Sequence, residues 1–178
     1  MPADLDSAFD VAFWFADQAL DSNEYLQPQK LHRLLFLAQA YYAVAFEGRK
    51  LMPAVFVADD LGPLEPNVFR AFSRGRPDVD IELFMPPEID AFLRGIWNRF
   101  GSQSADRLTR LTKRSAAYQK AFKRGKRAEI PLDQMRLSYT RDEGGPAVTR
   151  VVPPKVLITQ SGRAVKIKSW VPGSKPDE

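Results

Sequence analysis

The chain has 178 residues, a formal net charge of +4, no cysteine and a single histidine. A chain of this length is most simply one domain, long enough to bury about two thirds of the surface that its unfolded form exposes. The absence of cysteine excludes disulfides, thiol catalysis and thiolate metal sites, and one histidine excludes a multi-histidine metal site. No apolar run reaches the roughly 18 residues of a membrane span, and no basic–apolar leader opens the sequence. We therefore expect a cytoplasmic protein that does not bind membranes.

The first predicted element is a helix that begins after Ser7 or Asp6, because both residue types cap helices well, and ends near Leu20. Its residues are apolar nearly all round, which predicts burial against a neighbouring helix. Polar residues 21–24 then form a turn.

The longest helical pattern covers residues 28–46 and is expected to form the centre of the fold. Pro28 suits the first helical position, and Gly48 suits the position just past the end. Apolar residues recur at helical spacing over most of the circumference, so this helix is predicted to pack against several neighbours. The polar residues that indicate an exposed side are Lys30, His32, Arg33 and Gln39.

Residues 54–58 are a short apolar run of strand-forming residues that follows Pro53. Gly62 and Pro63 then predict a turn, and Pro66 predicts the first position of another helix. Further helices are predicted over 87–100, after a cap at Ser104, over about 115–124 and from Pro131.

Two segments near the C-terminus, residues 155–159 and 163–170, flank Gln-Ser-Gly and predict a β-hairpin. Because an isolated hairpin is only marginally stable in water, we expect it to pair with another strand, for which residues 54–58 are the candidate. Residues 171–178 are predicted to be disordered.

These elements together predict a mainly α fold, a compact helical domain around the central helix with a small C-terminal β-hairpin. The helical domain is expected over residues 1–138, and residues 139–170 are expected to extend it.

The residue patterns of common catalytic and metal sites do not appear in this sequence. It contains no Gly-rich phosphate loop, zinc-ligand spacing or nucleophile elbow, and His32 has no serine partner in a recognisable arrangement. Asp59 and Asp60 are adjacent acids, which can share a proton or bind a metal but more often solvate a turn. We therefore expect a protein with no catalytic activity, no cofactor and no metal.

Charge is distributed unevenly along the chain. Residues 1–29 contain acids and no Lys or Arg, whereas residues 107–127 contain nine Lys or Arg and no acid. Two interpretations stay open: a solvated helix face, or a surface that binds an acidic protein or nucleic acid. A basic nucleic-acid-binding regulator is the alternative function, although the segment offers few aromatic side chains for stacking on bases. Nucleic acid is therefore the less favoured partner.

Two sequence blocks carry a family resemblance. The first begins at Lys30 and reads Lys-Leu-x-x-Leu-Leu-aromatic-x-Ala-x-Ala; the second, residues 60–69, reads Asp-Leu-Gly-Pro-Leu-Glu-Pro-Asn-Val-Phe. In their order and spacing they resemble the Panacea antitoxin domain family, whose second block reads Tyr-Gly-Pro-Val-x-Pro-x-Val-Tyr. Ala58 and Leu61 stand where that family usually has Trp and Tyr.

The resemblance covers about residues 8–135 and implies a bacterial antitoxin that neutralises a co-encoded toxin protein by direct binding. Its SocA-like branch further implies a proteolytic adaptor that delivers the toxin to the ClpX unfoldase and its protease, ClpXP. Interfaces of this kind need a few desolvated anchors in a charged frame. The candidate partner-binding residues are Asp59, Asp60, Phe69, Arg110, Lys113, Arg114, Lys120 and Lys123.

Overall fold

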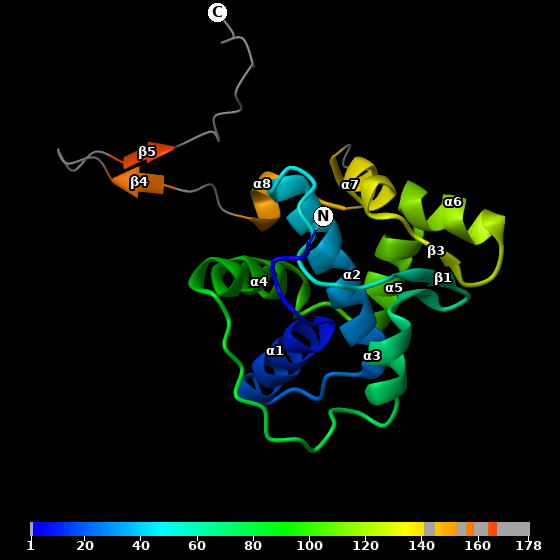
Figure 1. Cartoon of the computed structure of the whole chain (residues 1–178), viewed down its shortest axis with the longest axis horizontal. Helices are drawn as coiled ribbons and strands as arrows, with labels where there is room; N and C mark the ends of the chain where they lie inside the picture. Colours follow the sequence, from blue (N-terminus) through cyan, green and yellow to red (C-terminus); the bar gives the residue numbers. More distant parts are fainter. Residues whose placement is uncertain (1, 141–144, 153–155, 159–163, 167–178) are drawn as a thin grey trace, which may run out of the picture.

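The structure is a computed structural model that describes residues 2–140, 145–152, 156–158 and 164–166. Within these residues the chain is mainly helical with a small antiparallel sheet, so the predicted fold class is confirmed (Figure 1). The elements in chain order are α1 (Ala8–Asp21), α2 (Pro28–Ala45), β1 (Val57–Asp59), β2 (Gly62–Leu64), α3 (Pro66–Ala71), α4 (Pro87–Phe100), α5 (Ala105–Lys113), α6 (Ala116–Arg124), β3 (Ala128–Glu129), α7 (Leu132–Thr140), α8 (Val148–Val151), β4 (Val156–Ile158) and β5 (Ala164–Lys166).

Helix α2 runs through the centre of the fold and is the predicted central helix (Figure 1). It packs against α1, α3, α4, α5, α7, α8 and β2, and every residue from 31 to 43 is buried. The helix begins at Pro28, as predicted. Past its end the backbone reverses at Gly48, whose φ is 93° and whose N–H donates to the carbonyl of Ala43 over 2.7 Å.

The predicted exposed side of α2 was wrong for three of its four residues, because His32, Arg33 and Gln39 are buried. The Gln39 amide is satisfied inside the protein, since its oxygen accepts from the N–H of Met52 and its nitrogen donates to the Met52 carbonyl, both over 3.2 Å. A polar residue in the sequence therefore indicated a buried hydrogen bond here rather than contact with water.

Serine hydroxyls cap three of the predicted helices. Ser7 accepts a hydrogen bond from the N–H of Phe9 over 3.1 Å, and Ser104 and Ser115 cap α5 and α6 in the same way. These caps satisfy N–H groups that would otherwise lack a partner in the first helical turn. The sequence did not predict the short helix α8.

The small sheet has the strand order β2-β1-β3, and both pairings are antiparallel. The predicted strand over residues 54–58 begins later than expected, at Val57. The predicted turn at Gly62 and Pro63 was also misplaced, because both residues pair with β1 and the turn consists of Asp60 and Leu61.

The C-terminal hairpin forms a separate two-stranded sheet, β4-β5. The prediction that it pairs with residues 54–58 was wrong, because β1 already has β2 on one side and β3 on the other. The residues between β4 and β5, and residues 171–178 with their predicted disorder, lie outside the described residues. In the described ranges, no helix is both long enough and apolar enough to cross a membrane.

Candidate functional site

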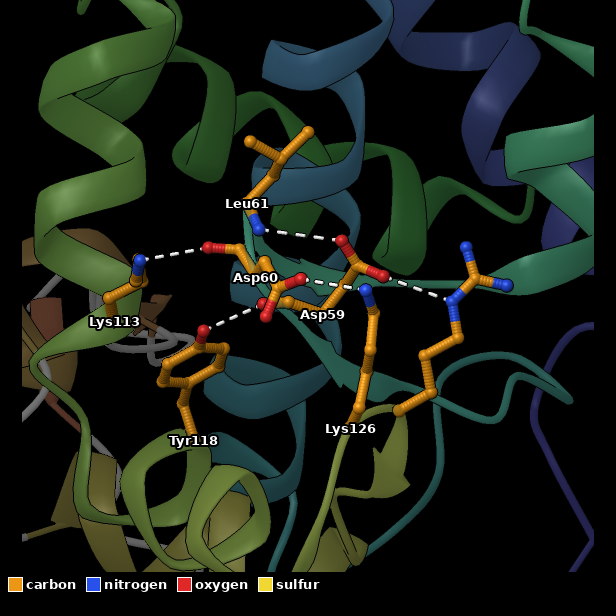
Figure 2. A network of polar contacts seen from close by, with 7 residues as sticks. Asp59, Asp60, Leu61, Lys113, Tyr118 and Lys126 are labelled. Carbon is orange, nitrogen blue, oxygen red and sulfur yellow. Dashed lines mark hydrogen bonds and ion pairs between the residues drawn. The ribbon is translucent and has the colours of Figure 1, made fainter.

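The turn between β1 and β2 is held in place by side chains from the surrounding helices (Figure 2). The hydroxyl of Tyr118 on α6 donates to the carbonyl of Asp59 over 2.7 Å, and the ammonium of Lys113 on α5 donates to the carbonyl of Asp60 over 2.9 Å. We call residues 59–63 the hairpin tip. Two of its carbonyls are thus fixed by two different helices.

Arg33 ties the hairpin tip to the central helix. Its guanidinium donates to the carbonyl of Pro63 over 2.5 Å and to the carbonyl of Leu61, and its Nε donates to the hydroxyl of Thr109 over 3.1 Å. Arg33 is only 2% exposed. Burial lowers its pKa to about 10, although the nearby Asp59 carboxylate acts in the opposite direction, so Arg33 stays charged at neutral pH.

The two adjacent acids of the tip have different surroundings (Figure 2). The Asp59 carboxylate is buried and accepts hydrogen bonds from Nε of Arg127 over 3.0 Å and from the N–H of Leu61 over 3.4 Å. Burial alone would raise the pKa of Asp59, but these hydrogen bonds and the nearby cations hold it below its usual value. Asp60 is exposed and forms an ion pair with Lys126 over 2.8 Å. Asp59 therefore stabilises the turn, and Asp60 lies on its surface.

Leu61 lies at the end of the hairpin tip and is 64% exposed. Its backbone is restrained at both ends, because its N–H donates to Asp59 and its carbonyl accepts from Arg33. Figure 2 shows the side chain pointing away from the ionic contacts below it. The fold thus holds an apolar side chain in water on a restrained backbone.

Helix α3 follows the tip and carries the candidate residue Phe69, which is 42% exposed. Glu65 caps this helix by accepting from the N–H of Val68 over 2.7 Å. Beside α3 lies a surface hollow of about 330 Å³, which we call the arginine hollow. Its lining residues are Pro66, Phe69, Arg70, Ser73 and Arg127.

His32 lies in the interior next to Phe69, with 5.7 Å between the ring centroids. Neither ring nitrogen has a hydrogen-bond partner within the described part of the chain. Burial and the charge of Arg33 lower the pKa of His32 to about 4, so the imidazole is neutral at pH 7. One buried N–H therefore lacks an acceptor, which costs free energy.

The candidate cations of α5 and α6 fall into two groups. Lys113 is half-buried and donates to the hairpin tip, whereas the other four are exposed and form no ion pair with any described acid. We call these four the α5–α6 cations: Arg110, Arg114, Lys120 and Lys123. The structure thus brings Asp59, Asp60 and Lys113 together at the tip.

Three residues that shape this site were not among the sequence candidates: Arg33, Leu61 and Arg127. The sequence predicts Arg33 on the exposed side of the helix. An arginine among apolar helical residues can also indicate a buried side chain that is paired with acceptors. Leu61 carried no clear signal, because the sequence predicts the turn at Gly62 and Pro63 and the structure has it at Asp60 and Leu61. Arg127 carried none, since it is one cation among nine in its segment.

Within the described residues, no group of three or more His, Asp or Glu side chains is arranged to hold a metal ion. Comparison of the chain with protein-family models, with curated proteins and with solved structures found no match.

Proposed function

We propose that this chain is a bacterial antitoxin that acts in the cytoplasm by binding and neutralising a co-encoded toxin protein. The observation that carries the proposal is the hairpin tip, on which three helices restrain the backbone while Leu61 stays exposed. A few desolvated side chains dominate interface energy, and a residue on an already ordered backbone loses less conformational freedom on binding. A restrained, exposed leucine meets that requirement.

A second observation supports the resemblance on which the antitoxin assignment rests. The two sequence blocks that resemble the Panacea family are in direct contact, because Arg33 of the first binds the carbonyls of Leu61 and Pro63 in the second. Gly62 lies against the same guanidinium. This contact gives a physical reason for a helix and a distant Gly-Pro segment to occur together.

Charge gives a third line of support. The α5–α6 cations are exposed and unpaired among the described residues, and the N-terminal 29 residues carry acids without any Lys or Arg. Three of these acids, Asp4, Asp17 and Glu24, form ion pairs within the chain, whereas the exposed cations can orient an acidic partner during encounter and discriminate against wrong partners. Such a surface suits a protein that recognises one partner protein.

The proposal is tested with the protein encoded next to this chain, by co-purification and by rescue of growth when both are expressed. Leu61→Asp is expected to weaken binding by about tenfold or more and to abolish rescue, because it places a charge in the centre of the contact. Leu137→Asp is the matched control, since Leu137 is 52% exposed on α7, away from the tip. Both variants should melt like the wild type. A wild type that binds no co-encoded protein would refute the antitoxin proposal.

The SocA-like branch adds a second expectation, that this chain delivers the bound toxin to ClpX. The half-life of the toxin in cells should then lengthen when either this chain or ClpX is absent. A toxin that is equally stable in all three strains would mean that binding alone neutralises it.

The α5–α6 cations also favour the alternative of a nucleic-acid-binding regulator. Binding to phosphates through four cations would weaken steeply with salt. Titration of labelled DNA at two salt concentrations separates the proposals, because an antitoxin of the proposed kind binds its protein partner without requiring DNA.

A further inference from the structure

We propose that the arginine hollow docks an acidic segment of the partner protein, in which an Asp or Glu lies beside an apolar side chain. This inference rests on the proposed function and deepens it, because it names the chemistry that this part of the surface recognises. The hollow lies next to the hairpin tip in the structure, since Arg127 lines the hollow and also binds Asp59 of the tip.

Two guanidinium groups give the hollow its charge. Arg127 uses Nε for Asp59, so its two terminal nitrogens take no part in that hydrogen bond, and its side chain is 54% exposed. Arg70 is exposed in the last turn of α3 and forms no ion pair with any described acid. Because a guanidinium matches a carboxylate in shape and charge, two of them beside one hollow favour a carboxylate ligand.

The rest of the lining is Pro66, Phe69 and Ser73, and the Ser73 hydroxyl donates to the carbonyl of Arg70 over 3.1 Å. Phe69 is 42% exposed and Pro66 lies beside it at the start of α3, so this side of the hollow offers an aromatic face rather than further charge. An exposed aromatic ring next to arginines is typical of interface anchors. The occupant that satisfies both walls carries an apolar side chain close to its carboxylate, as a Glu-Leu or Asp-Phe pair does.

Phe69 also connects the hollow to a group that reports on it. Its ring lies 5.7 Å from the ring of His32, which is buried and is the only histidine in the chain. Any ligand that moves Phe69 changes the surroundings of this imidazole. The ring signals of His32 therefore form a unique spectroscopic probe of the hollow in an untagged protein.

The test uses the untagged full chain and a panel of short fluorescent peptides, acetylated and amidated so that only side chains carry charge. The panel pairs Asp or Glu with Leu, Ile or Phe at several spacings, and a second panel replaces the acids with Asn or Gln. We expect acidic–apolar peptides to bind, and the amide panel to bind about tenfold more weakly or not at all. Bound acidic peptides should shift the His32 ring signals.

Two variants assign the binding to the hollow. Arg70→Glu is expected to weaken peptide binding by about tenfold or more, whereas Arg99→Glu, an equal charge change on α4, should change it by less than about twofold. Phe69→Ala should weaken binding as well. Arg127 is left intact, because its removal would also leave the Asp59 carboxylate without its hydrogen-bonded cation.

Equal weakening by the two charge variants, or binding that leaves the His32 signals unchanged, would overturn the inference. Wild-type protein that binds no peptide of either panel would also overturn it. Because no toxin is present in this experiment, its outcome is independent of the antitoxin proposal. Toxin binding that survives Arg70→Glu would refute the docking site and leave the proposed function standing.

Discussion

Gly62 and Arg33 lie so close together that residue 62 has no room for a side chain. A Cβ built on Gly62 would lie 2.8 Å from Cζ of Arg33 and 2.9 Å from its Nε. The φ of Gly62 is 119°, which side chains of L-residues rarely permit. Two separate reasons therefore require glycine at this position. One is its backbone angle, and the other is the close approach of the buried guanidinium that holds the hairpin tip.

This relationship predicts that Gly62→Ala destabilises the protein by more than backbone strain alone. Strain at positive φ costs about 1–3 kcal/mol, and displacement of Arg33 from the carbonyls of the tip should add to it. Gly125→Ala is the matched control, because its φ is 144° and nothing lies within 4 Å of a Cβ built there. Urea unfolding measures both variants. Equal losses of stability in the two would show that Arg33 moves aside without cost.

The helices were the part of the fold that the sequence predicted best, and hydrophobic periodicity is the reason. In α2 and α4 the apolar spacing, an initial proline and a following glycine all agree, and both helices have the predicted limits within one residue. The sheet was predicted less well, because its strands have only two or three residues each and such short runs carry almost no periodic signal.

The candidate site was predicted only in part, because its chemistry depends on contacts between distant segments. The sequence predicts Asp59, Asp60 and Lys113 as partner-binding residues, but the structure shows Asp59 and Lys113 stabilising the tip. The sequence predicts Arg33 on the exposed side of its helix, whereas in the structure it binds two backbone carbonyls about 30 residues further along the chain and the Thr109 hydroxyl. Because every residue has a backbone carbonyl, the amino-acid sequence does not indicate which carbonyls a buried arginine will bind.

Replacement of the adjacent acids Asp59 and Asp60 by Asn should change the stability of the protein by different amounts. Asp59→Asn is expected to lower the free energy of unfolding by about 1–2 kcal/mol at pH 7, because it weakens a part-buried charged hydrogen bond to Arg127. Asp60→Asn removes an exposed ion pair with Lys126 and should cost less than about 1 kcal/mol.

The contribution of Asp59 to the free energy of unfolding should also depend on pH, and the direction of this dependence follows from its lowered pKa. A carboxylate with a lowered pKa in the folded state stabilises the protein above its unfolded pKa, near 3.8, and loses that effect as the pH falls through the folded value. The difference between wild type and Asp59→Asn in urea unfolding should therefore shrink on acidification. A difference that stays constant below pH 4 would mean that the ion pair contributes nothing.

His32 should make the protein less stable in mild acid. Its pKa is about 4 in the folded state, against 6.5 for an exposed histidine, so protons bind the unfolded chain first as the pH falls. Between these two values this linkage removes about 3 kcal/mol of stability. His32→Leu should flatten the pH dependence over this range and be neutral or stabilising at pH 7, because it removes a buried N–H that has no acceptor among the described residues.

Gln39→Leu is the matched control for His32→Leu. Gln39 is equally buried in α2, but its amide is satisfied by the backbone of Met52 and does not titrate. This variant should lose stability by a similar amount at every pH, since it leaves the groups of Met52 without partners. A wild type and His32→Leu with parallel pH profiles would show that His32 is protonated equally in the folded and unfolded states.

The α5–α6 cations should act on the rate at which the proposed partner binds. Reversal of all four to Glu is expected to lower the association rate constant by about tenfold at low salt, with little change in dissociation, because exposed charges act mainly during encounter. The loss should diminish as salt screens the charges. Lys113 is left unchanged, because it donates to the carbonyl of Asp60 and its removal would disturb the hairpin tip.

A second charge-reversed protein tests whether the slower association results from the position of these cations or only from the change in net charge. Four exposed arginines on other parts of the chain are changed to Glu in this control: Arg74, Arg99, Arg136 and Arg150. Stopped-flow association at several salt concentrations then compares both proteins with the wild type. An equal loss in the two would mean that only net charge matters. If both associate like the wild type, the α5–α6 cations are a solvated surface, and recognition depends on the hairpin tip and the arginine hollow.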